Sequence, residues 1–267
     1  MRPISLAIIC LNEAANIERC IRSVPFANEI IVLDSGSTDE TRAIAKNLGA
    51  KVYNEEWRGF RAQKQRASDL CTNDGILSLD ADEALSPEAQ KEIEGLFVSP
   101  VELNQFDGYE LPRKSWNLGR WITHGGWYPD RQLRLFHQKR ATWRGGEHVH
   151  ERVYAEKVGQ LSEPILHWPF EDHSEQVATN NRYSSLGAKE LRGKGKRFSI
   201  LKLIFKPHSK FIETYFFKLG FLDGLPGFII SVGAAYSVFL KFAKLWELEN
   251  ASRLSGSQIT PSQKKTN

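Results

Sequence analysis

The acidic triplet Asp80-Ala81-Asp82 is the first group of residues whose types and spacing point to chemistry. Two carboxylates one residue apart suit Mg²⁺ or Mn²⁺, because these cations prefer carboxylate oxygens and usually keep phosphates and waters as their other ligands. Such a cation would neutralise the charge that develops on a departing diphosphate. Alone, the pattern is common and also fits a solvated turn, so its interpretation depends on the surrounding motifs.

Two further polar motifs follow apolar runs in the same way. Residues 34–39 read Asp-Ser-Gly-Ser-Thr-Asp, and Asn12-Glu13 follows the first apolar run. Their carboxylates could accept hydrogen bonds from a nucleobase imide and from ribose hydroxyls. Helix capping would explain Ser37, but it requires neither Asp34 nor Asp39. Three acidic strand ends in a chain of net charge +4 therefore indicate a ligand pocket.

Alternating strands and helices are expected to position these motifs. The apolar and helical patterns predict strands at residues 4–11, 29–34, 51–53 and 76–79, and helices at 15–24, at 60–70, after Ser37 and after Ser86. Ser37 and Glu40 have the spacing of a capping box, and Ser86-Pro87 that of an N-cap followed by proline. This alternation predicts an α/β fold with an open parallel sheet, in which ligands bind where strands end. The three motifs should therefore converge in space.

The segment 104–170 carries a second set of candidate residues. Strands are expected at 109–112 and 132–136, with a loop between them that contains Gly125, Gly126, Trp116, Trp121, Trp127 and Tyr128. Trp127 and Tyr128 suit stacking on a sugar, although they also fit a core beneath a long loop. Arg131 and Arg134 could bind a diphosphate or a phosphorylated acceptor bidentately if they face the site. Residues 147–151, Glu-His-Val-His-Glu, form the densest titratable cluster, on a strand or in a loop.

The remainder of the chain is expected to be helical and to lie on a membrane surface. Residues 174–191 have helical spacing, and residues 199–249 mix apolar and aromatic residues with lysines. That mixture fits helices in an anionic membrane interface, and a buried helical hairpin is the alternative. The uncharged stretch 224–240 is short for a spanning helix and contains proline and glycine. We expect a catalytic domain at 1–173, with halves 1–100 and 101–173, a membrane-associating region at 174–250 and a disordered tail at 251–267.

The composition of the chain indicates the cellular compartment of the protein and whether it binds nucleic acid. Cys10, Cys20 and Cys71 lie in predicted strands or helices and are odd in number, so we expect buried thiols in a reducing compartment. No Cys/His spacing of a zinc site is present. The run at 4–11 is too short for a signal peptide, which favours a cytoplasmic protein, peripheral on the inner face of the cytoplasmic membrane. The small positive charge is a weak argument for nucleic acid, and no nucleic-acid partner is expected.

In combination these motifs resemble glycosyltransferase family 2. Residues 11–13, 33–39 and 79–83 carry the resemblance, which implies a GT-A fold, that is, a Rossmann-like, mostly parallel sheet flanked by helices, and a transfer that inverts anomeric configuration. Residues 125–130, 132–136, 149–151 and 221–224 resemble the lipopolysaccharide core β-glucosyltransferases. This second likeness spans nearly the whole chain. It implies a UDP-glucose donor, a divalent metal cofactor, and a lipid-linked acceptor, a heptose of the lipopolysaccharide inner core.

The resemblance also implies roles by position. Glu13 and Asp39 would contact the uridine, Asp80 the ribose or the metal, and Asp82 would be the main metal ligand. A basic residue of the helix at 60–70, for which Lys64 is favoured, would approach the nucleotide, and a solvated basic face is the alternative. An inverting transfer needs a base for the acceptor hydroxyl. Glu151 is the candidate base, with Asp130 in reserve, and His150 would orient the base or bind the metal. The residues expected at the acceptor are Trp127, Tyr128, Arg131 and Arg134. Asn12 and Asp34 are expected at the nucleotide.

Other functions share part of this pattern. A transferase acting on polyprenyl phosphate or another glycan would use the same donor site. A nucleotidyltransferase should show a glycine-rich basic loop after its first strand, which Asn12-Glu13-Ala14-Ala15 is not. A catalytically inactive nucleotide-binding scaffold on the membrane should have lost a carboxylate motif, whereas all are present here.

Overall fold

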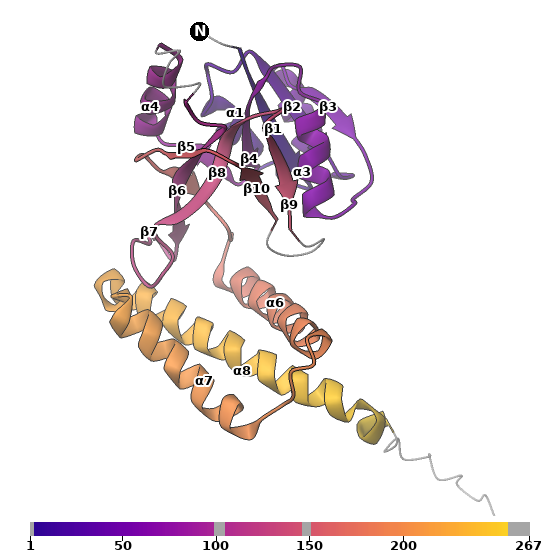
Figure 1. Cartoon of the computed structure of the whole chain (residues 1–267), viewed down its shortest axis with the longest axis vertical. Coiled ribbons are helices and arrows are strands. Elements are labelled where there is room, and N and C mark those ends of the chain that lie inside the picture. The colour runs from indigo at the N-terminus through magenta and orange to yellow at the C-terminus, as the bar shows by residue number, and fades with distance from the viewer. Residues whose placement is uncertain (1–2, 99–104, 146–150, 256–267) are drawn as a thin grey trace, which may run out of the picture. The chain divides into compact units, whose positions relative to one another are not determined.

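The computed structural model describes residues 3–98, 105–145 and 151–255 (Figure 1). Its sheet begins with four parallel strands in the order β3-β2-β1-β4. These strands are β1 (Ile4–Cys10), β2 (Glu29–Asp34), β3 (Lys51–Asn54) and β4 (Gly75–Asp80). Every residue of β1 is buried, as expected for a parallel strand that is covered on both faces. The four predicted strands and their parallel arrangement are confirmed.

Helices cover the two faces of this parallel half. They are α1 (Ile17–Arg22), α2 (Thr41–Asn47), α3 (Phe60–Asp69) and α4 (Pro87–Val98). Leu6 and Ile8 of β1 belong to one apolar core with residues of α1, and Ala7 and Ile9 belong to a second core with Ala67 of α3. This division follows from the side-chain alternation of a strand. Because both faces are filled, polar groups are left at the strand ends.

The two predicted helix starts have different outcomes. The Ser86 hydroxyl accepts a hydrogen bond from the Ala89 N–H at 3.0 Å, so the predicted N-cap of α4 is confirmed. The capping box predicted for Ser37 and Glu40 is wrong, because α2 begins only at Thr41 and has no side-chain cap. Ser37 is instead used to join the ends of β1 and β2.

Beyond β4 the sheet becomes mixed. The order continues through β8 (Asp130–His137), β6 (Gly108–Asn117), β12 (Ile165–His167) and β5 (Glu83–Leu85), while β11 (Val158–Gln160) and β7 (Arg120–Trp121) pair with β6. Strand β8 is antiparallel to both β4 and β6. Trp116 and Trp121, which were predicted in a loop, lie opposite each other in β6 and β7. Strands β9 (Ala141–Arg144) and β10 (Arg152–Ala155) form a separate antiparallel pair.

The chain divides into two compact units. The first comprises Met1–Thr123 and Trp127–Pro169, and the second comprises His124–Gly126 and Phe170–Asn267. The second unit contains α6 (His173–Gly193), α7 (Ile200–Ile212), η1 (Glu213–Phe217), η2 (Gly220–Asp223) and α8 (Gly224–Ser255). The helical unit thus begins after Pro169 and includes the tripeptide His124–Gly126, while the predicted limits of the catalytic domain and of the membrane-associating region stay predictions.

Hydrogen bonds within the helical unit explain the assignment of this tripeptide. The backbone N–H of His124 donates to Asp223 Oδ2 at 2.8 Å, and the N–H of Gly125 donates to the Lys218 carbonyl at 2.8 Å. Asp223 is fully buried. A buried carboxylate is stable only with such donors, so these bonds fasten the tripeptide to η2.

Helix α8 is longer than the sequence indicated. It continues to Ser255, so residues 251–255 are helical, and the rest of the predicted disordered tail lies outside the described residues. Pro226 lies in the first turn, where its missing N–H costs nothing. Within the described ranges, Gly220–Ala251 is long and apolar enough to cross a membrane by length and composition alone.

Candidate functional site

Asp80, at the end of β4, is held by two cations. Its Oδ1 lies 2.8 Å from Nζ of Lys64 on α3, and its Oδ2 lies 2.6 Å from Nη2 of Arg134 on β8. Both cationic side chains are buried. Burial by itself would raise the pKa of Asp80, but Arg134 and Lys64 hold that pKa well below its usual range. Asp80 is therefore an ionised carboxylate that is fixed at the strand end.

Glu83 extends this group of charges toward β6. Its buried carboxylate accepts from Arg134 at 2.7 Å and from Arg113 at 3.1 Å, and it also accepts the Asp80 N–H at 3.0 Å. Arg113 pairs in turn with Asp130 at 2.5 Å, its direct partner in the β6–β8 register. We call these five residues the ion cluster. Since β8 is antiparallel to β4 and β6, it brings cations from two strands to the end of β4.

Arg134 belongs to the ion cluster. Burial would lower the pKa of its guanidinium, but Asp80 and Glu83 raise it. Its side chain is buried and its Nη2 is bonded to both carboxylates, so the contacts that it makes in this structure are with the ion cluster, and its role at the acceptor stays a prediction. Arg131 is exposed, and its Nη1 donates to the Leu161 carbonyl at 3.0 Å. Its role at the acceptor stays a prediction.

Lys64 links Glu151 to the end of β4. Its Nζ lies 3.1 Å from Glu151 Oε1 while it also contacts Asp80. The ammonium thereby places the predicted base next to the predicted donor site. The Glu151 side chain is 17% exposed. His150, the other residue predicted for this position, lies outside the described residues.

Asp82 is the accessible carboxylate of the triplet. Its side chain is 26% exposed, and its Oδ2 lies 3.3 Å from Nε2 of His167. Nδ1 of the same imidazole lies 2.9 Å from the Ser115 hydroxyl. Strand β12 pairs with β5 and β6 so that His167 lies between Glu83 and Ser115. One nitrogen of this imidazole is thus held by a hydrogen bond, and the other is directed at a carboxylate. Histidines that bind metals in proteins are commonly oriented in this way, by a hydrogen bond at the nitrogen that does not bind the metal.

The residues around Asp82 fit a cation that is shared with a diphosphate. In the part of the chain that the structure describes, no group of three or more His, Cys, Asp or Glu side chains could hold a metal alone. Mg²⁺ at phosphate sites, however, uses one or two carboxylates and takes its other ligands from substrate and water. Asp80 has its oxygens engaged by Lys64 and Arg134, so the donor set favours Asp82 with His167 over the predicted Asp80.

The ends of β1 and β2 are joined by side-chain to backbone hydrogen bonds. Asn12, with φ of 56°, donates its N–H to the Ser37 hydroxyl at 2.8 Å and accepts the Thr38 N–H through Oδ1 at 2.8 Å. The Ala14 N–H donates to Asp39 Oδ2 at 3.1 Å. The predicted convergence of these two motifs is confirmed. Asn12 itself is used mainly to bind the neighbouring segment.

The carboxylates of this edge differ in accessibility. Asp34 is fully buried and accepts both the hydroxyl and the N–H of Ser37, so it shapes the turn, and its contact with the nucleotide stays a prediction. Asp39 is exposed, and a hydrogen bond from the Thr41 hydroxyl is the main cause that lowers its pKa. Glu13 is half-buried. Asp39 and Glu13 therefore stay nucleotide candidates.

Trp127 and Tyr128 lie between β7 and β8, directly ahead of Pro129 and Asp130. Both aromatic residues are half-buried, which leaves part of each ring open, as stacking on a sugar would need. Asp130 is 40% exposed, so it is the more accessible of the two candidate bases. The acceptor roles of the two aromatics stay predictions.

Three residues of this region were missed from the sequence. His167 ends the short apolar strand β12, which is the same signal that identified Asp80. Glu83 carries no such signal, because it follows Asp82 directly and reads as a turn residue. Arg113 lies inside β6, and its pairing depends on the cross-strand register with β8.

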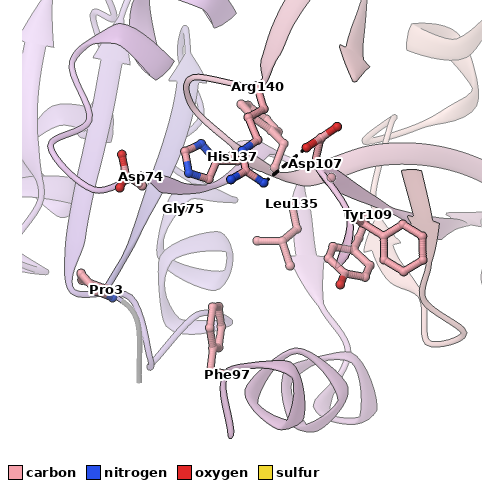
Figure 2. A pocket seen from close by; sticks show the side chains of 12 residues that line it. Pro3, Asp74, Gly75, Phe97, Asp107, Tyr109, Leu135, His137 and Arg140 are labelled. Carbon is pink, nitrogen blue, oxygen red and sulfur yellow. Dashed lines mark ion pairs between the residues drawn. The ribbon is translucent and has the colours of Figure 1, made fainter. Parts of the chain in front are cut away.

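A separate cavity of about 350 Å³ lies elsewhere in the first unit (Figure 2). Its lining includes Pro3, Gly75, Phe97 and Leu135, with Arg140 and Asp107 at 3.5 Å from each other. Because Gly75 begins β4 and Asp80 ends it, the cavity and the ion cluster are at opposite ends of that strand. The cavity is therefore no part of the candidate site.

Comparison with known proteins shows what this chain is similar to. The model of glycosyl transferase family 2 matches residues 5–151. The chain is 36% identical to an uncharacterized glycosyltransferase of Rickettsia felis, with 100% of this chain and 98% of that protein covered. It is 32% identical to the lipopolysaccharide core biosynthesis glycosyltransferase LpsC of Rhizobium meliloti, with 92% of each covered. A crystal structure of glucosyl-3-phosphoglycerate synthase from Mycobacterium tuberculosis is 27% identical over 43% of this chain and 44% of that chain, with a TM-score of 0.35.

Proposed function

This chain belongs to glycosyltransferase family 2, and from that premise we propose that it transfers glucose from UDP-glucose to a heptose of the lipopolysaccharide inner core. The relative that is named for lipopolysaccharide core biosynthesis supports this acceptor class. The observation that carries the proposal is the accessible pair of Asp82 and His167, at the sheet edge that also bears Asp39 and Glu13. One edge then offers groups for both a cation and a nucleotide.

On the donor side, the proposed assignments follow accessibility. Glu13 and Asp39 bind the uridine, and Asp82 with His167 holds Mg²⁺ or Mn²⁺. When bound, the cation neutralises the charge that develops on the departing UDP. Lys64 and Arg134 keep Asp80 in one position, which fixes the direction in which the following turn presents Asp82.

On the acceptor side, an inverting transfer requires a base on the sugar face opposite the diphosphate. We assign Glu151 to this role and keep Asp130 in reserve. As the acceptor oxygen forms its bond to the anomeric carbon, its proton passes to the carboxylate of the base and the bond to UDP breaks. Lys64, at 3.1 Å from Glu151, holds that carboxylate in place. Trp127, Tyr128 and the exposed Arg131 would contact the acceptor.

Exchanging the two candidate bases for their amides separates their roles. In Glu151→Gln we expect turnover to fall by about 10²–10⁴, the usual contribution of a positioned base, with UDP affinity unchanged. In Asp130→Asn turnover should stay within about tenfold of the parent, because Arg113 keeps Glu83 as a partner. Single-turnover rates and calorimetric UDP titrations would measure both effects. The reverse result would assign the base to Asp130.

Donor hydrolysis tests the proposed function without an acceptor. The purified chain, supplied with Mg²⁺ or Mn²⁺, should release UDP faster from UDP-glucose than from UDP-galactose or UDP-N-acetylglucosamine. Adding a heptose-terminated lipopolysaccharide core should accelerate release and yield a glucosylated product in mass spectra. Acceleration by a polyprenyl phosphate, with none by the heptose acceptor, would reject the acceptor and leave the donor assignment intact. Release from none of the sugars would reject both.

The proposed location is the inner face of the cytoplasmic membrane. UDP-sugars are cytoplasmic donors under this proposal, and a lipid-linked acceptor lies in the bilayer. Cys10, Cys20 and Cys71 are free and buried, as the sequence predicted, which suits a reducing compartment.

A further inference from the structure

The second unit exposes large apolar side chains along α7 and onward through η1 and η2 to the start of α8. We name as the apolar face Leu201, Phe205, Ile212, Phe217, Leu222 and Leu225, all of them exposed. Phe217 is 81% exposed and Leu225 69%. Single exposed apolar residues are ordinary, but a group drawn from α7, η1, η2 and the start of α8 marks an interaction surface.

Lysines border this face along α7. Leu201 and Phe205 are four residues apart and share one row of the helix, and Lys202 and Lys206 form the adjacent row. Both lysines are exposed. The positive charge of Lys210 is neutralised by an ion pair with Glu213 at 3.3 Å. The positive charge that borders the apolar face on α7 therefore comes from Lys202 and Lys206. An apolar row bordered by lysines is the pattern of a helix that lies in an anionic membrane interface.

The polar helix α6 excludes a spanning arrangement of this unit. It packs along α8 (Figure 1), and Lys244 of α8 donates to Asn181 Oδ1 at 2.5 Å and to the Ser184 hydroxyl at 2.7 Å. Arg192 of α6 donates to the Leu248 carbonyl at 2.9 Å. If α8 crossed a bilayer, these charged groups and the polar surface of α6 would enter the hydrocarbon, which is costly. The apolar face along α7, η1, η2 and the start of α8 can instead lie in the membrane interface without a crossing.

We propose that the apolar face docks this protein onto a bilayer that contains anionic lipid, with α7 lying in the interface and no helix crossing. The proposal rests on the proposed function, because a lipid-linked acceptor requires the enzyme at a membrane. It adds the residues that bind, the lipid charge that they recognise and the depth of insertion. The other possible occupant of such a face, a second copy of this chain, is decided by the same experiment.

Binding of the full-length chain to vesicles tests this docking surface. The parent should sediment with vesicles of phosphatidylcholine and phosphatidylglycerol and bind pure phosphatidylcholine weakly. Phe205→Ser with Phe217→Ser should weaken binding at least tenfold, because burial of two aromatic side chains is lost. The matched control is Val177→Ser with Tyr183→Ser, which removes exposed apolar side chains from α6 and should leave binding unchanged.

Charge is tested separately from apolar contact. Lys202→Gln with Lys206→Gln should weaken binding to the anionic vesicles about 30-fold, since each basic residue near an anionic surface contributes about fivefold. The same pair should change binding to neutral vesicles little. Cell membranes that hold the parent should release it in alkaline carbonate, and retention there would show a spanning helix and overturn the proposal.

Two further outcomes would also overturn it. One is equal binding by the Phe and the control variants. The other is a lipid-free dimer in analytical ultracentrifugation that the Phe variant abolishes, together with no binding to vesicles. Vesicle binding needs no donor sugar, and transfer to a detergent-dispersed acceptor needs no docking. Loss of one result with retention of the other therefore shows which proposal has failed.

Discussion

Replacing Asp82 by alanine is expected to lower sugar transfer by about 1,000-fold, because a cation on the leaving diphosphate stabilises the transition state by several kcal/mol. The fold should be preserved. The Asp82 side chain is only partly buried, and its one ion-pair partner in the described chain is His167 at 3.3 Å. Initial rates at saturating UDP-glucose with increasing Mn²⁺, and a thermal melt of the same sample, would measure the two effects.

Asp74→Ala is the matched control for this substitution. Asp74 precedes Gly75 at the other end of β4, and its carboxylate is 62% exposed beside Lys139. Its removal should leave both activity and stability within experimental error of the parent. Full activity of Asp82→Ala, or full activity of the parent in excess EDTA, would contradict the metal assignment. Asp80→Ala would be a poor substitute, since it leaves Lys64 and Arg134 without their shared carboxylate.

Replacing Arg134 by methionine is expected to reduce the free energy of unfolding by about 3–5 kcal/mol, the usual cost of breaking a buried ion pair on one side. Arg134 is buried, and its Nη2 contacts Asp80 at 2.6 Å and Glu83 at 2.7 Å. Without it, two carboxylates stay close together in a buried site. Urea unfolding at neutral pH would measure the loss.

The effect of this substitution should also depend on pH. Arg134 helps to hold the pKa of Asp80 and of Glu83 below their usual values. Carboxyls with lowered folded-state pKa values stabilise the fold above their unfolded pKa of about 4, and that stability is lost as the pH falls below it. The difference between parent and Arg134→Met should therefore shrink on acidification from about pH 4.

Arg131→Met, on the same strand, is the control for Arg134→Met. Its guanidinium is exposed and contacts one backbone carbonyl, so we expect a change within about 0.5 kcal/mol, as for most surface substitutions. Equal losses in the two variants would contradict the assignment of Arg134 to the ion cluster.

Sequence patterns identified the donor half well because its determinants are local. The apolar runs that form β1, β2 and β4 are nearly continuous, and each ends at a polar residue or shortly before one, at the same edge of a parallel sheet. The α/β GT-A class is confirmed by the family match and by the strand order β3-β2-β1-β4. The residue type of Asp34 suggested a ligand contact, but it could not indicate that the Ser37 hydroxyl and N–H bind this carboxylate inside the turn.

The remaining assignments depended on pairings between distant strands. Whether Arg134 faces an acceptor or a carboxylate is decided by the antiparallel placement of β8 beside β4. The approach of His167 to Asp82 depends on β12 lying between β5 and β6, and the length of α8 depends on packing against α6 and α7. Local patterns thus determined which residues end the strands, because hydrophobic periodicity depends only on residues that are close together in the sequence. Only the tertiary structure decided which of those charges neutralise each other and which, like Asp82, stay accessible, because burial and ion pairing depend on residues that are far apart in the chain.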